Sequence, residues 1–80
     1  MENITINDPK VKEWLGRYKT VIWDKNAKYG ELFILAKIGT KFDLLRFFKI
    51  GGKTEVSVDI HNKDMEFMLI HLFEYYVNKY

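Results

Sequence analysis

Residues 37–53 of the chain read KIGTKFDLLRFFKIGGK and contain two glycine turns that decide the fold. Gly39-Thr40 and Gly51-Gly52 each stand between apolar runs, and glycine reaches the positive φ that a two-residue hairpin turn requires. Two such turns set the register of three consecutive strands, because residues equally distant from a turn must face one another. This register gathers one apolar face, made of Leu32, Ile34, Ala36, Ile38, Leu45, Phe47, Val56, Val58 and Ile60. The stretch therefore predicts an antiparallel meander.

The segments on either side of the meander are predicted to be helices. Asp8 can cap a first helix that starts at Pro9, where the missing N–H costs nothing. Asn62 can cap a second helix, with acidic side chains in its first turn. We therefore expect an α+β fold with a helix at about residues 8–18, three or four antiparallel strands between residues 20 and 60, and a long helix at about 62–79.

The register also makes a prediction about the core. Phe47 and Val58 lie on the apolar face of the predicted sheet. We expect that face to pack against Leu69 and Leu72 of the C-terminal helix, because those two side chains fall on its main apolar stripe. Phe47 and Val58 should then be buried.

A winged helix-turn-helix is the alternative fold. Residues 40–43 resemble a capping box, so residues 42–50 could form a helix that stops at Gly51. Residues 29–38 could form another helix, and residues 54–60 would then be the wing. The two folds differ in whether residues 29–50 are hairpin strands or helices.

Length and composition limit the class of protein. The chain has 80 residues, which predicts a single domain over 1–80. Hydrophobic residues make up 48% and charged residues 30%, a balance that excludes a disordered chain. There is no cysteine, which excludes disulfides and thiolate metal sites. The N-terminus lacks the pattern of a signal peptide and no apolar run is long enough to span a bilayer, so we expect a cytoplasmic protein without membrane contact.

The sequence offers little catalytic chemistry. Gly52-Lys53-Thr54 ends like a phosphate-binding loop, but Phe47 stands where that motif needs its leading glycine. His61 and His71 are the only histidines and lie in different predicted elements. Ser57, the only serine, lies within a strand. We expect a non-enzyme with no cofactor, no metal and no small-molecule substrate.

Aromatic and aliphatic residues exceed what so small a core can bury. The chain holds two Trp, five Tyr and six Phe, and the C-terminal helix carries Phe67, Ile70 and Val77 outside its main stripe. Protein interfaces favour such residues. We therefore expect a protein–protein interface at these three residues and a homodimer. By analogy, small binders of this kind include accessory and inhibitor proteins of phages and viruses.

Nucleic-acid binding is the alternative function. Eleven of the thirteen basic residues, but only six of the eleven acids, lie before Thr54. The second face of the predicted sheet interleaves cations with rings, as folds that stack single-stranded bases do. The residues predicted to bind nucleic acid are Lys37, Arg46, Lys49, Phe33, Phe42 and Phe48.

Overall fold

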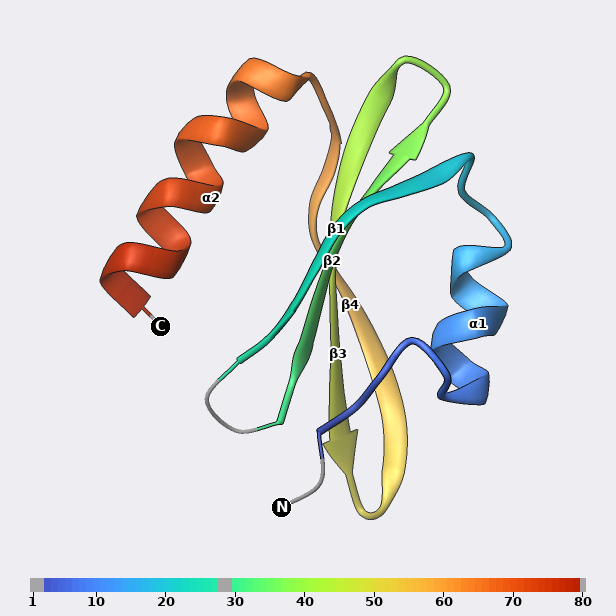
Figure 1. Cartoon of the computed structure of the whole chain (residues 1–80). Coiled ribbons are helices and arrows are strands. Elements are labelled where there is room, and N and C mark those ends of the chain that lie inside the picture. The colour runs from blue at the N-terminus through green and yellow to red at the C-terminus, as the bar shows by residue number, and fades with distance from the viewer. Residues whose placement is uncertain (1–2, 28–29, 80) are drawn as a thin grey trace.

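The computed structural model describes residues 3–27 and 30–79, with side chains as far as residue 72. The elements in chain order are α1 (Pro9–Leu15), β1 (Thr20–Asn26), β2 (Leu32–Ile38), β3 (Lys41–Ile50), β4 (Lys53–Lys63) and α2 (Met65–Lys79). The strands form an open antiparallel sheet in the order β1-β2-β3-β4 (Figure 1). The predicted α+β class and antiparallel meander are confirmed. The winged helix-turn-helix is not supported, because β2 and β3 are strands where that fold needs helices.

Both glycine turns adopt the predicted geometry. Gly39, Gly51 and Gly52 have φ angles of 61°, 56° and 78°, in the left-handed region that glycine adopts without strain. Every pair in the β2–β3 hairpin matches the predicted register. In the β3–β4 hairpin the match runs from the turn to the pair of Leu45 with Val58.

Two bulges in β4 end the predicted register. Asp59 is the first extra residue. After it, Ile60 faces Leu44 instead of Asp43, so the predicted pairing is wrong at this point. The second bulge includes Asn62, whose φ is 57°, a left-handed conformation that asparagine tolerates better than most residues. The first bulge moves Ile60 to the opposite face of the sheet from Val56, where it packs in a second core.

The buried carboxylate of Asp43 accounts for the second bulge. The side chain of Asp43 accepts hydrogen bonds from the Asn62 backbone N–H at 2.7 Å and from the Tyr18 hydroxyl at 2.8 Å. Nδ1 of His61 lies 3.0 Å from the same carboxylate. Burying a charge without donors is costly. The bulge turns a backbone N–H of β4 toward a carboxylate that would otherwise lack one.

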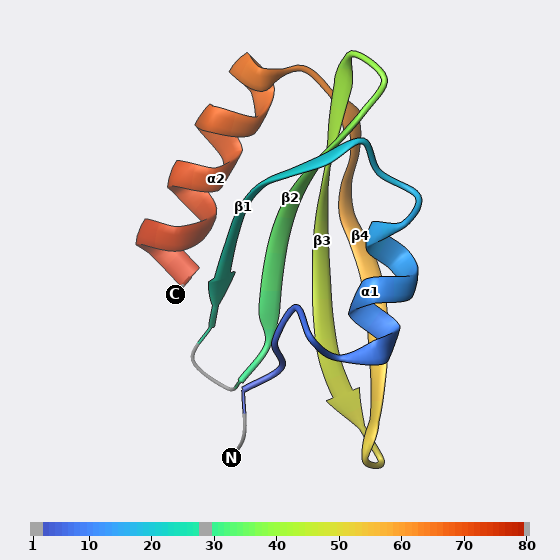
Figure 2. The same cartoon turned by 45° about the vertical axis from the view of Figure 1, so that its right-hand side comes forward.

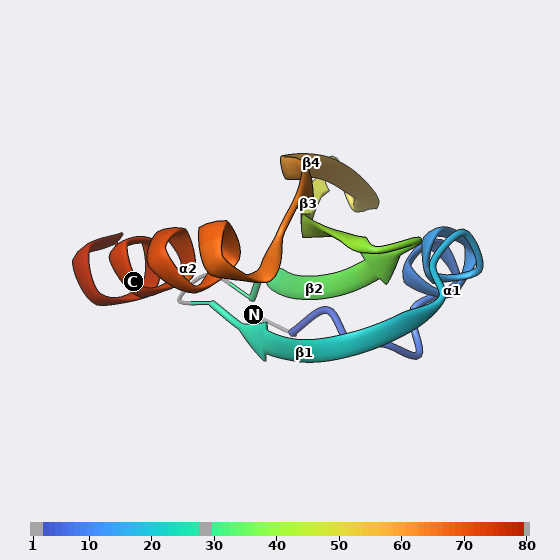
Figure 3. The same ribbon diagram turned by 90° about the horizontal axis from the view of Figure 1, so that it is seen from above.

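The core has two parts, one on each face of the sheet. The cluster on the α1 side contains Ile4, Val11, Leu32, Ile34, Ala36, Leu45 and Phe47. The cluster on the α2 side contains Phe33, Leu35, Phe42, Leu44 and Met68. Seen from above, the sheet lies between the two helices (Figure 3). Each helix therefore covers a different face.

This arrangement corrects the predicted core. Phe47 is fully buried, as predicted. Its face packs against α1, however, so the prediction that it lies opposite Leu69 and Leu72 is wrong. Val58 is 38% exposed, because it lies on the outer strand of the sheet, so its predicted burial is wrong too. Both faces of β2 and β3 are apolar, so alternation alone did not indicate which helix covers which face.

α1 begins where the sequence predicts and ends earlier. Asp8 is its cap and accepts the Lys10 N–H at 2.9 Å. The helix ends at Leu15 instead of Tyr18, with Gly16 as its C-terminal cap. Tyr18 lies beyond the helix end, where its hydroxyl reaches the sheet.

α2 begins after a connection that passes over the end of the sheet (Figure 2). The predicted cap, Asn62, is wrong, because that residue belongs to β4. Asp64 fills this role instead, since its carboxylate accepts the Phe67 N–H at 2.9 Å.

Candidate protein-binding surface

α2 packs on the sheet through one stripe of side chains. Met68 is fully buried, and Met65 and Leu72 pack against the same cluster. Residues at this spacing share one helix face. Leu69 and Ile70 lie off the stripe and are 62% and 55% exposed. The helix therefore presents two large aliphatic side chains to solvent.

An open groove of about 570 Å³ lies between α2 and β1. Its lining is Ile22, Trp23, Lys25, Leu35, Met65, Leu69 and Leu72. β1 bulges at Ile22, and such a bulge re-aims the side chains around it. We refer to Ile22, Trp23, Leu69 and Ile70 together as the α2 surface.

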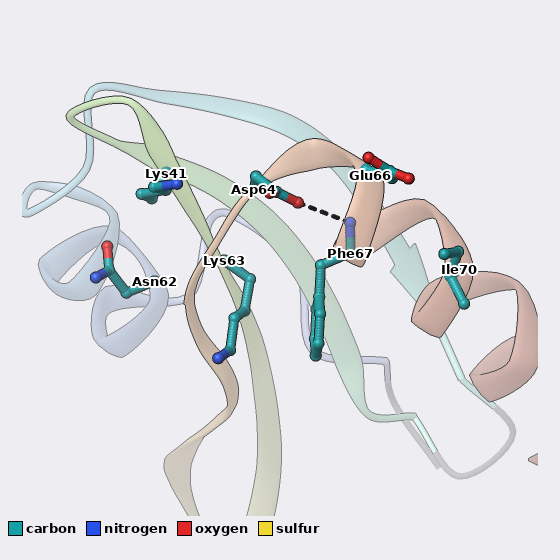
Figure 4. A pocket seen from close by; sticks show the side chains of 7 residues that line it. All are labelled: Lys41, Asn62, Lys63, Asp64, Glu66, Phe67 and Ile70. Carbon is teal, nitrogen blue, oxygen red and sulfur yellow. Dashed lines mark hydrogen bonds between the residues drawn. The ribbon is translucent and has the colours of Figure 1, made fainter.

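A second hollow of about 480 Å³ lies on the other side of α2, near its first turn (Figure 4). Its lining carries both signs of charge, with Phe67 and Ile70 as its large apolar side chains. The Phe67 ring stacks on His71 with the ring centroids 4.1 Å apart, and Nζ of Lys63 lies 5.1 Å from the Phe67 centroid. Phe67 is half-buried and already contacts His71 and Lys63.

The predicted interface residues Phe67 and Ile70 differ in their exposure to solvent. Ile70 is exposed and Phe67 is partly covered. Val77 lies outside the described side chains. Leu69, which the sequence predicts on the buried stripe, is exposed instead, because Met68 takes the buried position one residue earlier. Either spacing from Met65 suits a helix, so the pattern did not separate the two.

The rings predicted to stack nucleic-acid bases do not share an open face. Phe33 and Phe42 are buried in the cluster beneath α2. Phe48 is half-buried, with the Arg46 guanidinium carbon 5.0 Å from its ring centroid. A base cannot stack on a ring that a helix covers. Nucleic-acid binding therefore stays a prediction, but two of the three rings predicted to stack on bases are buried.

The cations predicted beside those rings are already engaged. Arg46 forms ion pairs with Glu31 at 3.0 Å and Asp59 at 3.1 Å. Lys49 lies 3.9 Å from the Asp8 carboxylate. Nζ of Lys37 lies 5.9 Å from the centroid of the buried Phe42 ring. The ion pairs of Arg46 and Lys49 partly neutralise the positive charge that would bind a phosphate backbone.

Two titratable groups are perturbed by their surroundings. Burial, and then the Asp43 carboxylate, raise the pKa of Tyr18 well above its ordinary value of 10.0. Partial desolvation raises the pKa of Asp8, but the hydrogen bonds from Thr54 and Lys10 and the charge of Lys49 outweigh it. The pKa of Asp8 therefore lies below its ordinary value of 3.8. Asp8 thus joins the start of α1 to β4, and Tyr18 joins the chain just after α1 to β3.

The described part of the chain holds neither a metal-binding cluster nor a membrane-spanning helix. No group of three or more His, Cys, Asp or Glu side chains in it could hold a metal ion. No helix in it is long and apolar enough to cross a membrane. No protein-family model, curated protein or solved structure matches the chain. Its function has to be inferred from the arrangement of its own side chains.

Proposed function

We propose that the protein is a small non-enzymatic binding protein that acts through protein–protein contacts as a homodimer, and that the α2 surface binds a partner protein. The supporting observation is the exposure of Leu69 and Ile70 on a helix whose other stripe is already packed. Contiguous exposed apolar groups are typical of partner sites. The groove beside Leu69 continues this apolar surface onto β1.

Burial of the α2 surface would contribute favourably to the free energy of binding a partner. Full burial of a Leu or Ile side chain contributes about 1.5–3 kcal/mol. Leu69 and Ile70 are both more than half exposed, so covering them would contribute about 2–3 kcal/mol together. Trp23 lines the groove, and a half-buried tryptophan is a favourable anchor for a partner.

The polar side-chain clusters stabilise the fold, and this structural role favours a non-enzymatic protein. Asp43 and His61 lie at the distance of a proton-transfer pair. The same carboxylate, however, holds the end of α1 through Tyr18 and the bulge through Asn62. Arg46 of β3 likewise pairs with Asp59 of β4 and with Glu31, the residue just before β2. These contacts stabilise the sheet.

Site-specific photo-crosslinking tests the partner surface. A benzoylphenylalanine at position 70, in cells that make the protein, should give a discrete adduct on irradiation. Leu69→Glu in the same chain should abolish the adduct, because a charge then lies in the apolar contact. Mass spectrometry of the adduct separates a second copy of the chain from a different protein.

Ile50 provides the matched control. Its side chain is 62% exposed, as is that of Leu69, but it lies at the β3–β4 turn away from α2. The same photo-reactive residue at position 50 should give no discrete adduct. Equal adducts at both positions, or an adduct that survives Leu69→Glu in a chain with unchanged circular dichroism, would show that the α2 surface is ordinary surface.

A further inference from the structure

The outer edge of β4 carries unused hydrogen-bonding groups. Within the described residues β4 pairs with β3 alone, and α1 and α2 lie over the faces of the sheet instead of its β4 edge (Figure 3). A two-residue turn makes its flanking pair, here Ile50 with Lys53, a hydrogen-bonded pair. Alternation along the strand then directs the backbone groups of Thr54, Val56 and Val58 away from β3.

Only the first half of this edge is regular. Residues 53–58 pair with β3 without interruption, and the bulges at Asp59 and Asn62 distort the rest. The opposite edge of the sheet, β1, is interrupted near its middle by the bulge at Ile22. Another strand can add only along a regular stretch. Residues 53–58 therefore form the longest regular free edge.

We propose that a second copy of this chain pairs with β4 along this edge, antiparallel, about a two-fold axis at Val56. In this register Val56 faces Val56 of the other copy, and Thr54 faces Val58. Glu55 faces Ser57, and Lys53 lies beside Asp59. The pairing uses the whole regular stretch of both copies and ends at the bulge of each.

Charge complementarity selects this register. Centring the axis on Glu55 would place two Glu55 carboxylates together. Centring it on Ser57 would place Glu55 opposite Asp59 twice. Like charges directly opposite destabilise a strand pair, whereas opposite charges stabilise it. The register centred on Val56 places no like charges together and brings each Lys53 beside an Asp59.

The same pairing accounts for an exposed side chain. Val56 packs at the margin of the α1-side cluster, and Val58 is 38% exposed on the outer strand. In the pair, β-branched side chains from both copies meet on that face, an arrangement that stabilises antiparallel strands. The α2 surface lies along β1, at the other edge of the sheet, so it stays free in both copies.

Disulfide trapping tests the register, and the cysteine-free chain makes the readout simple. Val56→Cys should form a linkage between copies under mild oxidation, because facing Cα atoms lie about 5.5 Å apart, within disulfide reach. Val58→Cys is the matched control on the same strand and face. Its two copies lie about 13 Å apart along the strand, so it should form no linked dimer. The double variant Thr54→Cys/Val58→Cys should form linked dimers again, which serves if Val56→Cys folds poorly.

This proposal rests on the homodimer of the proposed function, and the experiment separates the two. Light scattering should give twice the monomer mass for the unmodified chain. A monomer at high concentration would overturn both the homodimer and the β4 pairing. A dimer that is trapped by Ile70→Cys and by neither β4 variant would retain the homodimer and overturn the β4 pairing. Equal trapping of Val56→Cys and Val58→Cys would overturn it as well, because collisions then explain both.

Discussion

Replacing Asp43 by alanine should destabilise the protein more than any other change to a polar residue. The carboxylate is only 2% exposed and joins three parts of the chain. It accepts from the Tyr18 hydroxyl after α1 and from the Asn62 N–H in the second bulge of β4, and it lies next to His61. Asp43→Ala removes the acceptor for all of them at once.

The magnitude follows from the groups left behind. An unsatisfied buried donor costs about 1–3 kcal/mol, and breaking a buried charged network costs about 3–5 kcal/mol. His61 is largely exposed and finds water easily, so the cost rests mainly on Tyr18 and Asn62. We therefore expect a loss of about 3 kcal/mol, which lowers Tm by about 12–24 °C in a domain of this size.

Urea unfolding followed by tryptophan fluorescence and by circular dichroism measures the loss. Asp24→Ala, an exposed acid on β1, is the control and should change the free energy of unfolding by less than about 0.5 kcal/mol. Tyr18→Phe, which removes one donor and leaves the carboxylate, should cost about 1–2 kcal/mol. If Asp43→Ala cost no more than the Asp24 control, the carboxylate would not hold the second bulge of β4.

Three further changes have expected outcomes. Phe47→Ala should cost about 3–5 kcal/mol in urea unfolding, whereas Val58→Ala should cost under about 1 kcal/mol, since only the first is fully buried; equal costs would contradict the core. Above pH 10 the unfolded chain loses the Tyr18 proton and the folded chain keeps it, so stability should fall as pH rises, and less steeply in Tyr18→Phe; identical slopes would show that the Tyr18 pKa is not raised. Gly52→Ala should cost about 1–2 kcal/mol by backbone strain alone, because its φ is 78° and a Cβ would meet nothing within 4 Å; a neutral change in Tm would contradict this.

The meander could be predicted because its signals are local. A two-residue glycine turn sets the pairing of the strands that flank it, and the period of two then places each side chain on a face. The same reasoning succeeded for the cap at Asp8, where the side chain bonds a backbone group two residues away. In each case the residues that decide the structure are close together in the chain.

The errors arose where distant residues decide the structure. The bulge at Asn62 follows from a carboxylate on β3, which no pattern within β4 indicates. Leu69 was placed on the buried stripe because nothing local distinguishes it from Met68. The apolar groove depends on the bulge at Ile22, which also has no signal in the alternation of β1. The sequence therefore predicted Ile70 as a contact residue but missed the groove beside it.

The buried carboxylate of Asp43 also affects where the α2 surface lies. Asp43 holds the backbone of Asn62 in a left-handed conformation, and α2 starts just after that residue. The first bulge has already moved Ile60 to the α2 side of the sheet, so the chain leaves β4 toward that face. The connection after β4 passes over the end of the sheet, and α2 then lies along β1 (Figure 2). Leu69 and Trp23 line the same groove there. The position of the α2 surface thus depends on a residue that is not part of that surface. The β4 edge stays regular only as far as the bulges that redirect the chain.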